Sequence, residues 1–164
     1  MLALTIEDKK AFTKELFMGT MFDRFQCCKV VLHHNVDYHI DGHYNIDFFD
    51  SEEQEERRKQ TYAFWSELKP FVFQILKGQR LPKSFQIVLC AAPTSIAQML
   101  ATSASVLTPE QVEGLYLNLH YKEDVLSLTT GSAYRVFTMD KSLDRVFEDA
   151  VVKLIRTHGI AFLQ

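Results

Sequence analysis

The strongest pattern of hydrophobic and polar positions lies in the last quarter of the chain. Apolar residues recur there every three or four positions, which is typical of an amphipathic helix with one buried face. These positions are Leu143, Val146, Phe147, Ala150, Val151, Leu154 and Ile155. Asp140 can cap the start of this helix, and Gly159 is placed to end it. We therefore expect a helix that packs one face on the core.

A period of two residues, typical of strands, dominates the segment before that helix. Alternating apolar residues predict a strand with one buried face over residues 115–121. A turn at 123–124 would return the chain as a second strand and pair Leu119 with Leu128, so that the apolar faces agree. A Gly-Ser step then predicts an interruption, followed by a third strand over 134–138.

The first half of the chain is predicted mainly from helix-start signals. After a short strand, a helix should begin at Thr5 and stop near Gly19. Capping-box spacing at Ser51 predicts a second helix, which Pro70 must end or kink. Residues 71–76 are compatible with a helix or a strand, because periodicity cannot decide over six residues.

A β-type run over 85–91 and helix starts at Ser95 and Thr108 complete a recurring order of elements. Strand, helix, hairpin and helix follow one another twice, without a repeat at the level of residues. This order predicts an α+β fold, with antiparallel hairpins packed against helices, in a single domain over residues 1–164. It also raises the alternative of a pseudo-twofold repeat. The layout is similar to the repeating unit of DNA sliding clamps, a likeness that says little about function.

The histidine-rich stretch NVDYHIDGHYNIDFFD suggests a site on a hairpin. We expect two strands over residues 29–49, joined by the loop 40–42 with glycine at the position of positive φ. His39 and His43 would then be cross-strand neighbours, with Cβ atoms about 5 Å apart and Asp37 on the same face. Two imidazoles and a carboxylate suffice to bind a divalent metal. The alternatives are a solvated polar face and a polar pocket for a ligand or partner.

A second candidate site is the basic segment KGQRLPK. Lys77, Arg80 and Lys83 could hold a phosphate group or a nucleic-acid backbone. The segment contains no P-loop pattern, and a solvated connector is the alternative. The formal net charge of the chain is -3 at pH 7, so the strong basic signal of a nucleic-acid-coating protein is absent. Nucleic acid is therefore not the favoured partner.

Cysteine usage and hydropathy bear on the compartment. The three cysteines, Cys27, Cys28 and Cys90, are odd in number and form no C-x-x-C pair. We expect all three to be reduced, as in the cytoplasm. The N-terminal stretch is charged by its seventh residue, so we expect no signal peptide. No apolar run approaches the roughly 18 residues of a membrane helix, so we expect no membrane partner.

Six short stretches carry a resemblance to a known family. They are FDRF (22–25), HIDGH (39–43), DFFD (47–50), W-x-x-x-K-P-F (65–71), LKGQRLP (76–82) and TTGS (129–132). On these stretches the chain resembles an uncharacterised bacterial family of small single-domain proteins, a domain of unknown function. The resemblance covers nearly the whole chain and implies a bacterial cytosolic protein. It brings no activity and no site residues.

Three functional hypotheses follow from the sequence. We expect a small non-catalytic cytoplasmic binding protein, because no catalytic signature occurs and no cofactor is implied. Its partner is unknown and includes the alternative of self-association as a homodimer; a sizeable apolar surface patch would favour this hypothesis. The first alternative is a metal-dependent hydrolytic enzyme centred on His39, His43 and Asp37. The second is a nucleic-acid-associated module that uses Lys77, Arg80 and Lys83.

Overall fold

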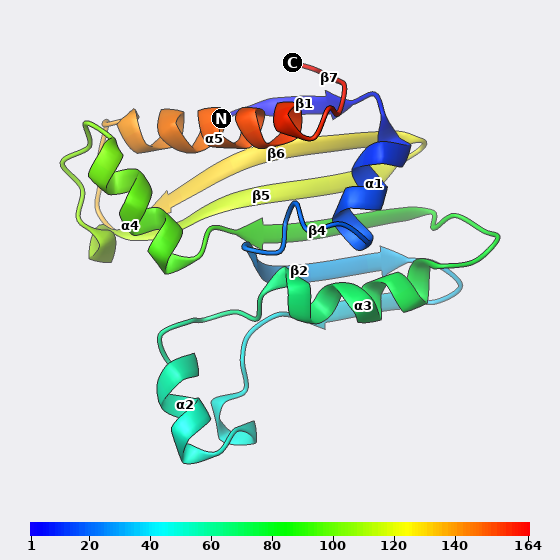
Figure 1. Cartoon of the computed structure of the whole chain (residues 1–164), viewed down its shortest axis with the longest axis horizontal. Coiled ribbons are helices and arrows are strands. Elements are labelled where there is room, and N and C mark those ends of the chain that lie inside the picture. The colour runs from blue at the N-terminus through cyan, green and yellow to red at the C-terminus, as the bar shows by residue number, and fades with distance from the viewer.

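A computed structural model describes all 164 residues and contains one antiparallel sheet with helices (Figure 1). Seven strands lie in the order β3-β2-β4-β5-β6-β1-β7 across the sheet. The strands are β1 Ala3–Ile6, β2 Gln26–His33, β3 Asp37–Asp41, β4 Ser84–Cys90, β5 Val112–Lys122, β6 Val125–Tyr134 and β7 Phe162–Leu163. The helices are α1 Lys9–Phe17, α2 Ser51–Arg57, α3 Trp65–Leu76, α4 Pro93–Thr102 and α5 Ser142–Thr157, with 3-10 turns at Ile46–Phe48 and Pro109–Gln111. The predicted α+β fold is confirmed.

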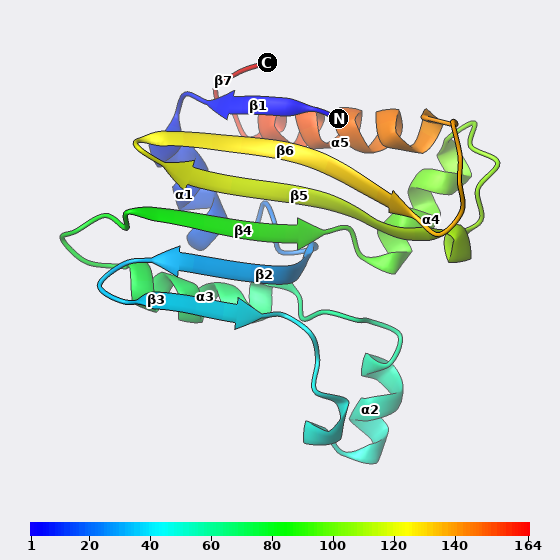
Figure 2. The same ribbon diagram turned by 180° about the vertical axis from the view of Figure 1, so that it is seen from behind.

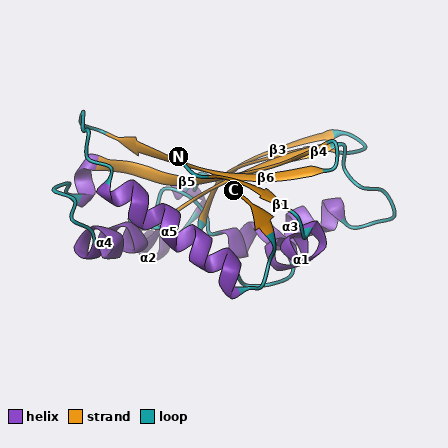
Figure 3. Ribbon diagram, turned by 90° about the horizontal axis from the view of Figure 1, so that it is seen from above, coloured by secondary structure: helices purple, strands orange, loops and turns teal.

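The helices lie on one face of the sheet, and the other face is bare (Figures 2 and 3). Each strand therefore alternates between a row of side chains under the helices and a row on the open face. On β5, Leu117 and Leu119 are fully buried, whereas His120 is exposed. The buried rows and the apolar helix faces form one core cluster of 28 residues. None of the helices combines the length and the apolar character needed to span a membrane.

Two predicted elements are confirmed closely. α5 is the amphipathic helix expected from its apolar spacing, and Gly159 follows its end with a φ of 67°. β5 and β6 form the predicted hairpin, with Leu119 opposite Leu128. The turn residues Glu123 and Asp124 have φ values of 51° and 62°, which match the tight turns that follow the twist of a hairpin.

The third strand predicted over 134–138 is wrong. β6 runs without a break through Gly131 as far as Tyr134, because Gly131 keeps its place in the ladder opposite Tyr116. The missing side chain interrupts the hydrophobic pattern but leaves the backbone pairing intact.

The predicted turn of the histidine-rich hairpin is also wrong. The chain turns at 34–36, so that His39 on β3 lies opposite Val31 on β2. Gly42 follows β3, at a point where a Cβ atom would lie 1.7 Å from the carbonyl oxygen of Cys27. Glycine is therefore required there because two backbones approach closely, and not because φ is positive.

The helix predicted to end or kink at Pro70 is in fact two helices, α2 and α3. The connector between them is extended, because Ala63 accepts a hydrogen bond from the Cys27 N–H and donates one to the Gly42 carbonyl, each at 2.8 Å. α3 then continues through Pro70 and includes 71–76, so that segment is helical.

The order strand, helix, hairpin and helix recurs along the chain, but the sheet neighbours do not repeat. In the second unit, β4 pairs with β5. In the first unit, β1 pairs with β6 and β7 instead of β2. The alternative of a pseudo-twofold repeat is therefore not realised in the sheet, because β4 occupies the place beside β2.

Candidate ligand-binding groove

A groove lies between α1 and the C-terminal end of α3. Figure 1 shows both helices in front of the sheet. The volume of the groove is about 470 Å³, which falls within the range of small-molecule binding sites. The lining comes from α1, the end of α3, the loop after α3, and the strands β4 to β6. Three separate stretches of the chain, 9–18, 73–85 and 121–126, therefore build one concave surface.

The floor of the groove is aromatic. Phe85 on β4 lies opposite Tyr121 on β5, and both side chains belong to the rows under the helices. Their rings stack with centroids 5.4 Å apart. Phe17 from α1 meets Phe85 edge to face at 6.0 Å, and Leu126 from β6 extends the floor. Strand register alone brings the first two rings together, and α1 adds the third.

The walls of the groove are apolar and partly exposed to solvent. Phe73 and Leu76 line it from α3, and Met18 and Leu81 line it from the segments after α1 and α3. Met18 is 60 % exposed and Leu81 is 81 % exposed. Large apolar side chains gathered around a concavity and left in water are typical of a binding surface.

The rim of the groove is positively charged. Lys9 is neutralised by Asp124, whose carboxylate lies 2.7 Å from its Nζ atom. Lys10, Lys14 and Lys77 also line the groove and take part in none of the ion pairs of the chain. Three uncompensated ammonium groups therefore surround an apolar floor, in a chain whose net charge is negative.

The predicted histidine site lies elsewhere, because Tyr38 and Ile40 turn towards the core and leave His39 on the open face of the sheet. His43 lies beyond the strand, and its ring packs on Tyr62 with centroids 4.4 Å apart. The structure places no group of three or more His, Cys, Asp or Glu side chains so that they could hold a metal ion. The predicted register, in which His39 and His43 are cross-strand partners, is therefore wrong.

Asp37 of the predicted site and the neighbouring Asp41 each have a histidine partner. Asp37 lies 2.8 Å from Nδ1 of His33, and this hydrogen bond lowers the pKa of Asp37. Asp41 accepts a hydrogen bond from the backbone N–H of His43 at 3.0 Å and also contacts its ring, and both interactions lower the pKa of Asp41. These are two local pairs at the surface.

Only one of the three cations of the predicted basic loop lines the groove. Lys77 lies on the rim, whereas Arg80 and Lys83 are exposed farther along the loop and do not line the groove. The backbone N–H of Lys83 donates to the carbonyl of His33 at 2.8 Å, which holds this end of the loop against β2. The three cations are thus not gathered into one anion site.

Sequence reasoning missed the groove because its lining is distant in sequence. One local signal was present: Lys10, Lys14 and Phe17 are spaced by four and three residues and therefore share one face of α1. A helix face that mixes lysine with phenylalanine is neither a plain core face nor a plain solvated face. Phe85 and Tyr121 were recognisable only as buried strand residues.

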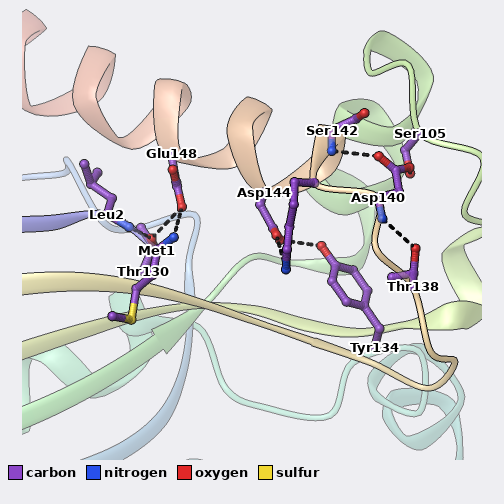
Figure 4. Close-up of polar contacts among 11 residues, drawn as sticks. Met1, Leu2, Ser105, Thr130, Tyr134, Thr138, Asp140, Ser142, Asp144 and Glu148 are labelled. Atoms are coloured by element: carbon purple, nitrogen blue, oxygen red, sulfur yellow. Dashed lines mark hydrogen bonds and ion pairs between the residues drawn. The ribbon is translucent and has the colours of Figure 1, made fainter.

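A polar network at the other end of the helical side has a structural role (Figure 4). The Tyr134 hydroxyl donates to Asp144 on α5; burial acts to raise the pKa of Asp144, but this and other hydrogen bonds lower it. Asp140 accepts from the Ser142 N–H at 2.8 Å and from the Ser105 hydroxyl at 2.8 Å. Hydrogen bonds from Ser142 and Ser105 lower the pKa of Asp140 to about 2. Asp140 was predicted as the cap of α5, but the N-cap residue is Lys141, and Asp140 instead binds the N–H of the first helical residue from one position before it.

Comparison with known proteins gives one match. A family model described as a family of unknown function (DUF5721) matches residues 15–163 of the chain. No curated protein and no solved structure matches.

Proposed function

The chain belongs to a family of unknown function, and we propose from its groove that the protein is a non-catalytic binding protein for an amphipathic anion. The ligand has one apolar chain and a small anionic head, either a carboxylate or a phosphate. The apolar chain lies on the aromatic floor, and the head is held at the rim by Lys10, Lys14 and Lys77.

The observation that carries this proposal is the coincidence of an apolar floor with uncompensated lysines in one groove. Burial of apolar surface supplies affinity at about 25 cal/mol per Å². Lysine ammonium groups at the rim attract an anion without requiring one fixed geometry, because the side chains are flexible point charges. A neutral ligand would leave the lysine ammonium groups without a partner, and a cationic ligand would be repelled by them.

The lining supports binding rather than catalysis. It offers apolar surface, lysines, the Thr13 hydroxyl and one aspartate that already pairs with Lys9. A nucleophile beside a general base, as covalent catalysis requires, is not part of this set.

A calorimetric titration of the tag-free protein tests the proposal. The probes are octanoate, decanoate and dodecanoate below their aggregation concentrations, with dodecyl phosphate to compare the head groups. Affinity should rise with chain length, by up to about fourfold for each CH₂ that becomes fully buried. Dodecyltrimethylammonium, which has the same chain and the opposite charge, should bind at least tenfold more weakly.

Two results would contradict the proposal. One is equal binding of the cationic and anionic probes, and the other is no binding of any probe. A second copy of the chain is the alternative occupant of the groove, as a homodimer. This alternative predicts a dimer that light scattering detects and that substitutions in the aromatic floor abolish. Added amphiphile should then have no effect on the dimer.

We also propose the bacterial cytoplasm as the compartment. The three cysteines Cys27, Cys28 and Cys90 are all free thiols. Unpaired thiols in this number favour a reducing environment. Growth of a producing bacterium followed by fractionation and immunoblotting should recover the protein with the cytoplasmic marker.

A further inference from the structure

Two thiols lie side by side on the open face of the sheet, opposite to the side that carries the groove. Cys90 is at the end of β4, directly across from Gln26 on β2. Cys28 lies in a β-bulge between Cys27 and Lys29, where the register of β2 against β4 shifts. A bulge redirects the residue that it adds to a strand. Cys28 is in this way brought next to Cys90.

The two thiols are close enough to affect each other's acidity. The pKa of Cys28 responds to the Cys90 thiol and to the Tyr62 hydroxyl. The Cys90 thiol also lies 3.8 Å from Oε1 of Gln26, whose Nε2 atom is buried without a partner. Cys90 is 4 % exposed, so these contacts are made in a nearly closed environment.

Cys28 is the more exposed of the two thiols. Cys28 is partly exposed and lines a hollow of about 340 Å³, together with His39, Asp41 and His43. Cys90 is 4 % exposed and lines a separate hollow of about 220 Å³ with Gln26, Tyr62 and Tyr116. Cys27, the neighbour of Cys28 in sequence, is fully buried in the core on the helical side. The chain therefore contains an accessible thiol, a buried thiol beside it, and a third thiol in a different environment.

The acidities of the three thiols differ as well. The hydrogen bond with the Cys90 thiol lowers the pKa of Cys28, although burial opposes this effect. The same hydrogen bond, together with burial, raises the pKa of Cys90. Burial raises the pKa of Cys27 to about 12. Because the thiolate is the nucleophile, Cys28 is the reactive one.

We propose that Cys28 and Cys90 form a peroxide-sensitive oxidation site that closes into a disulfide across β2 and β4. The Cys28 thiolate attacks one oxygen of hydrogen peroxide, the O–O bond breaks, and the products are a Cys28 sulfenic acid and, after protonation, water. The Cys90 sulfur then attacks the Cys28 sulfur. A disulfide forms, the S–O bond breaks, and the hydroxide takes up the Cys90 proton as a second water. Two thiols and one peroxide thus give one disulfide and two waters.

The test treats the tag-free wild-type protein with hydrogen peroxide and maps peptides by mass spectrometry without reduction. The expected product is an intramolecular Cys28–Cys90 disulfide, with Cys27 still alkylatable after unfolding. Cys90→Ser should stop at the Cys28 sulfenic acid, which dimedone traps. Cys27→Ser is the matched control and should oxidise like the wild type. Cys28→Ser should lose thiol at least tenfold more slowly.

Any other pattern would overturn the proposal. A disulfide to Cys27 would do so, as would dimedone labelling of Cys27 in Cys90→Ser. So would three free thiols in the protein after a treatment in which the peroxide oxidised free glutathione, the positive control in the same tube. Circular dichroism checks that each variant is folded. If Cys90→Ser does not fold, the peptide map of the wild type decides by itself.

Discussion

Tyr121 stacks on Phe85 in the floor of the groove, with ring centroids 5.4 Å apart, although the two residues lie 36 positions apart in sequence. Strands β4 and β5 place them opposite each other, so the pair depends on sheet register and not on any local motif. Because Phe85 is buried and Tyr121 is partly exposed, Tyr121 is the ring that a ligand can touch.

Truncation of this ring should weaken ligand binding. Tyr121→Ala removes the exposed part of the aromatic floor, and we expect about a tenfold loss of decanoate affinity and a stability loss of about 1–2 kcal/mol. Calorimetry and urea unfolding measure the two effects. Tyr116→Ala is the control, because Tyr116 is on the same strand and points to the open face. An equal loss of affinity in both variants would show that the floor is not involved.

The lysines of α1 should set the preference for anions. Lys10→Gln with Lys14→Gln removes two exposed charges, each contributing about 0.7 kcal/mol, so that affinity for decanoate should fall about tenfold. Added salt should weaken binding to the wild type more than to the double variant. Lys153→Gln on α5 is the control, since Lys153 is exposed and does not line the groove. The control should bind like the wild type, and a comparable loss there would argue for non-specific attraction.

The close contact at Gly42 should make this position intolerant of any side chain. A Cβ there would lie 1.7 Å from the backbone oxygen of Cys27, so one of the two chains must move. We expect Gly42→Ala to destabilise the protein by about 3 kcal/mol or more in urea unfolding. In contrast, a Cβ at Gly131 meets nothing closer than 4.0 Å. Gly131→Ala should therefore be neutral or stabilise β6 by about 0.5 kcal/mol; a similar loss in both variants would contradict this explanation.

The stabilising contact of Asp140 with the first residue of α5 should depend on pH. Hydrogen bonds from Ser142 and Ser105 lower the pKa of Asp140 to about 2, below its ordinary value of 3.8. The ionised carboxylate therefore stabilises the fold at pH values above about 4, and this contribution is lost as the pH falls towards 2. Asp140→Asn should lower stability at neutral pH, and its difference from the wild type should shrink between pH 4 and pH 2. Urea unfolding across this range measures the difference in stability, and a constant difference would rule out this role of the ionised carboxylate.

Local patterns were sufficient where the pairing partners are close in sequence. The hairpin of β5 and β6 could be predicted in register, because its two-residue turn leaves only one alignment in which Leu119 and Leu128 share the buried face. α5 could be predicted because its own spacing defines its apolar stripe. The pattern misled where Gly131 interrupted the apolar alternation but not the backbone ladder.

Contacts between distant segments decided the rest. Gly42 was read as a turn residue, yet its role is to approach the Cys27 carbonyl, and the extended connector at Ala63 exists because it hydrogen-bonds with Cys27 and Gly42. Neither requirement is visible in a window of neighbouring residues. The same holds for the groove, whose floor and rim come from α1, the end of α3 and three strands.

The sequence by itself determined the α+β class, the buried faces of β5 and α5, and the reduced state expected of the cysteines. Each of these follows from the spacing of nearby residues or from the composition of the chain. Only the tertiary structure decided which residues form a site. It separated His39 from His43 by moving the hairpin turn, joined Lys77 to the lysines of α1, and set Cys28 beside Cys90. Sites of this kind depend on strand register and helix placement, which the packing of the whole core fixes.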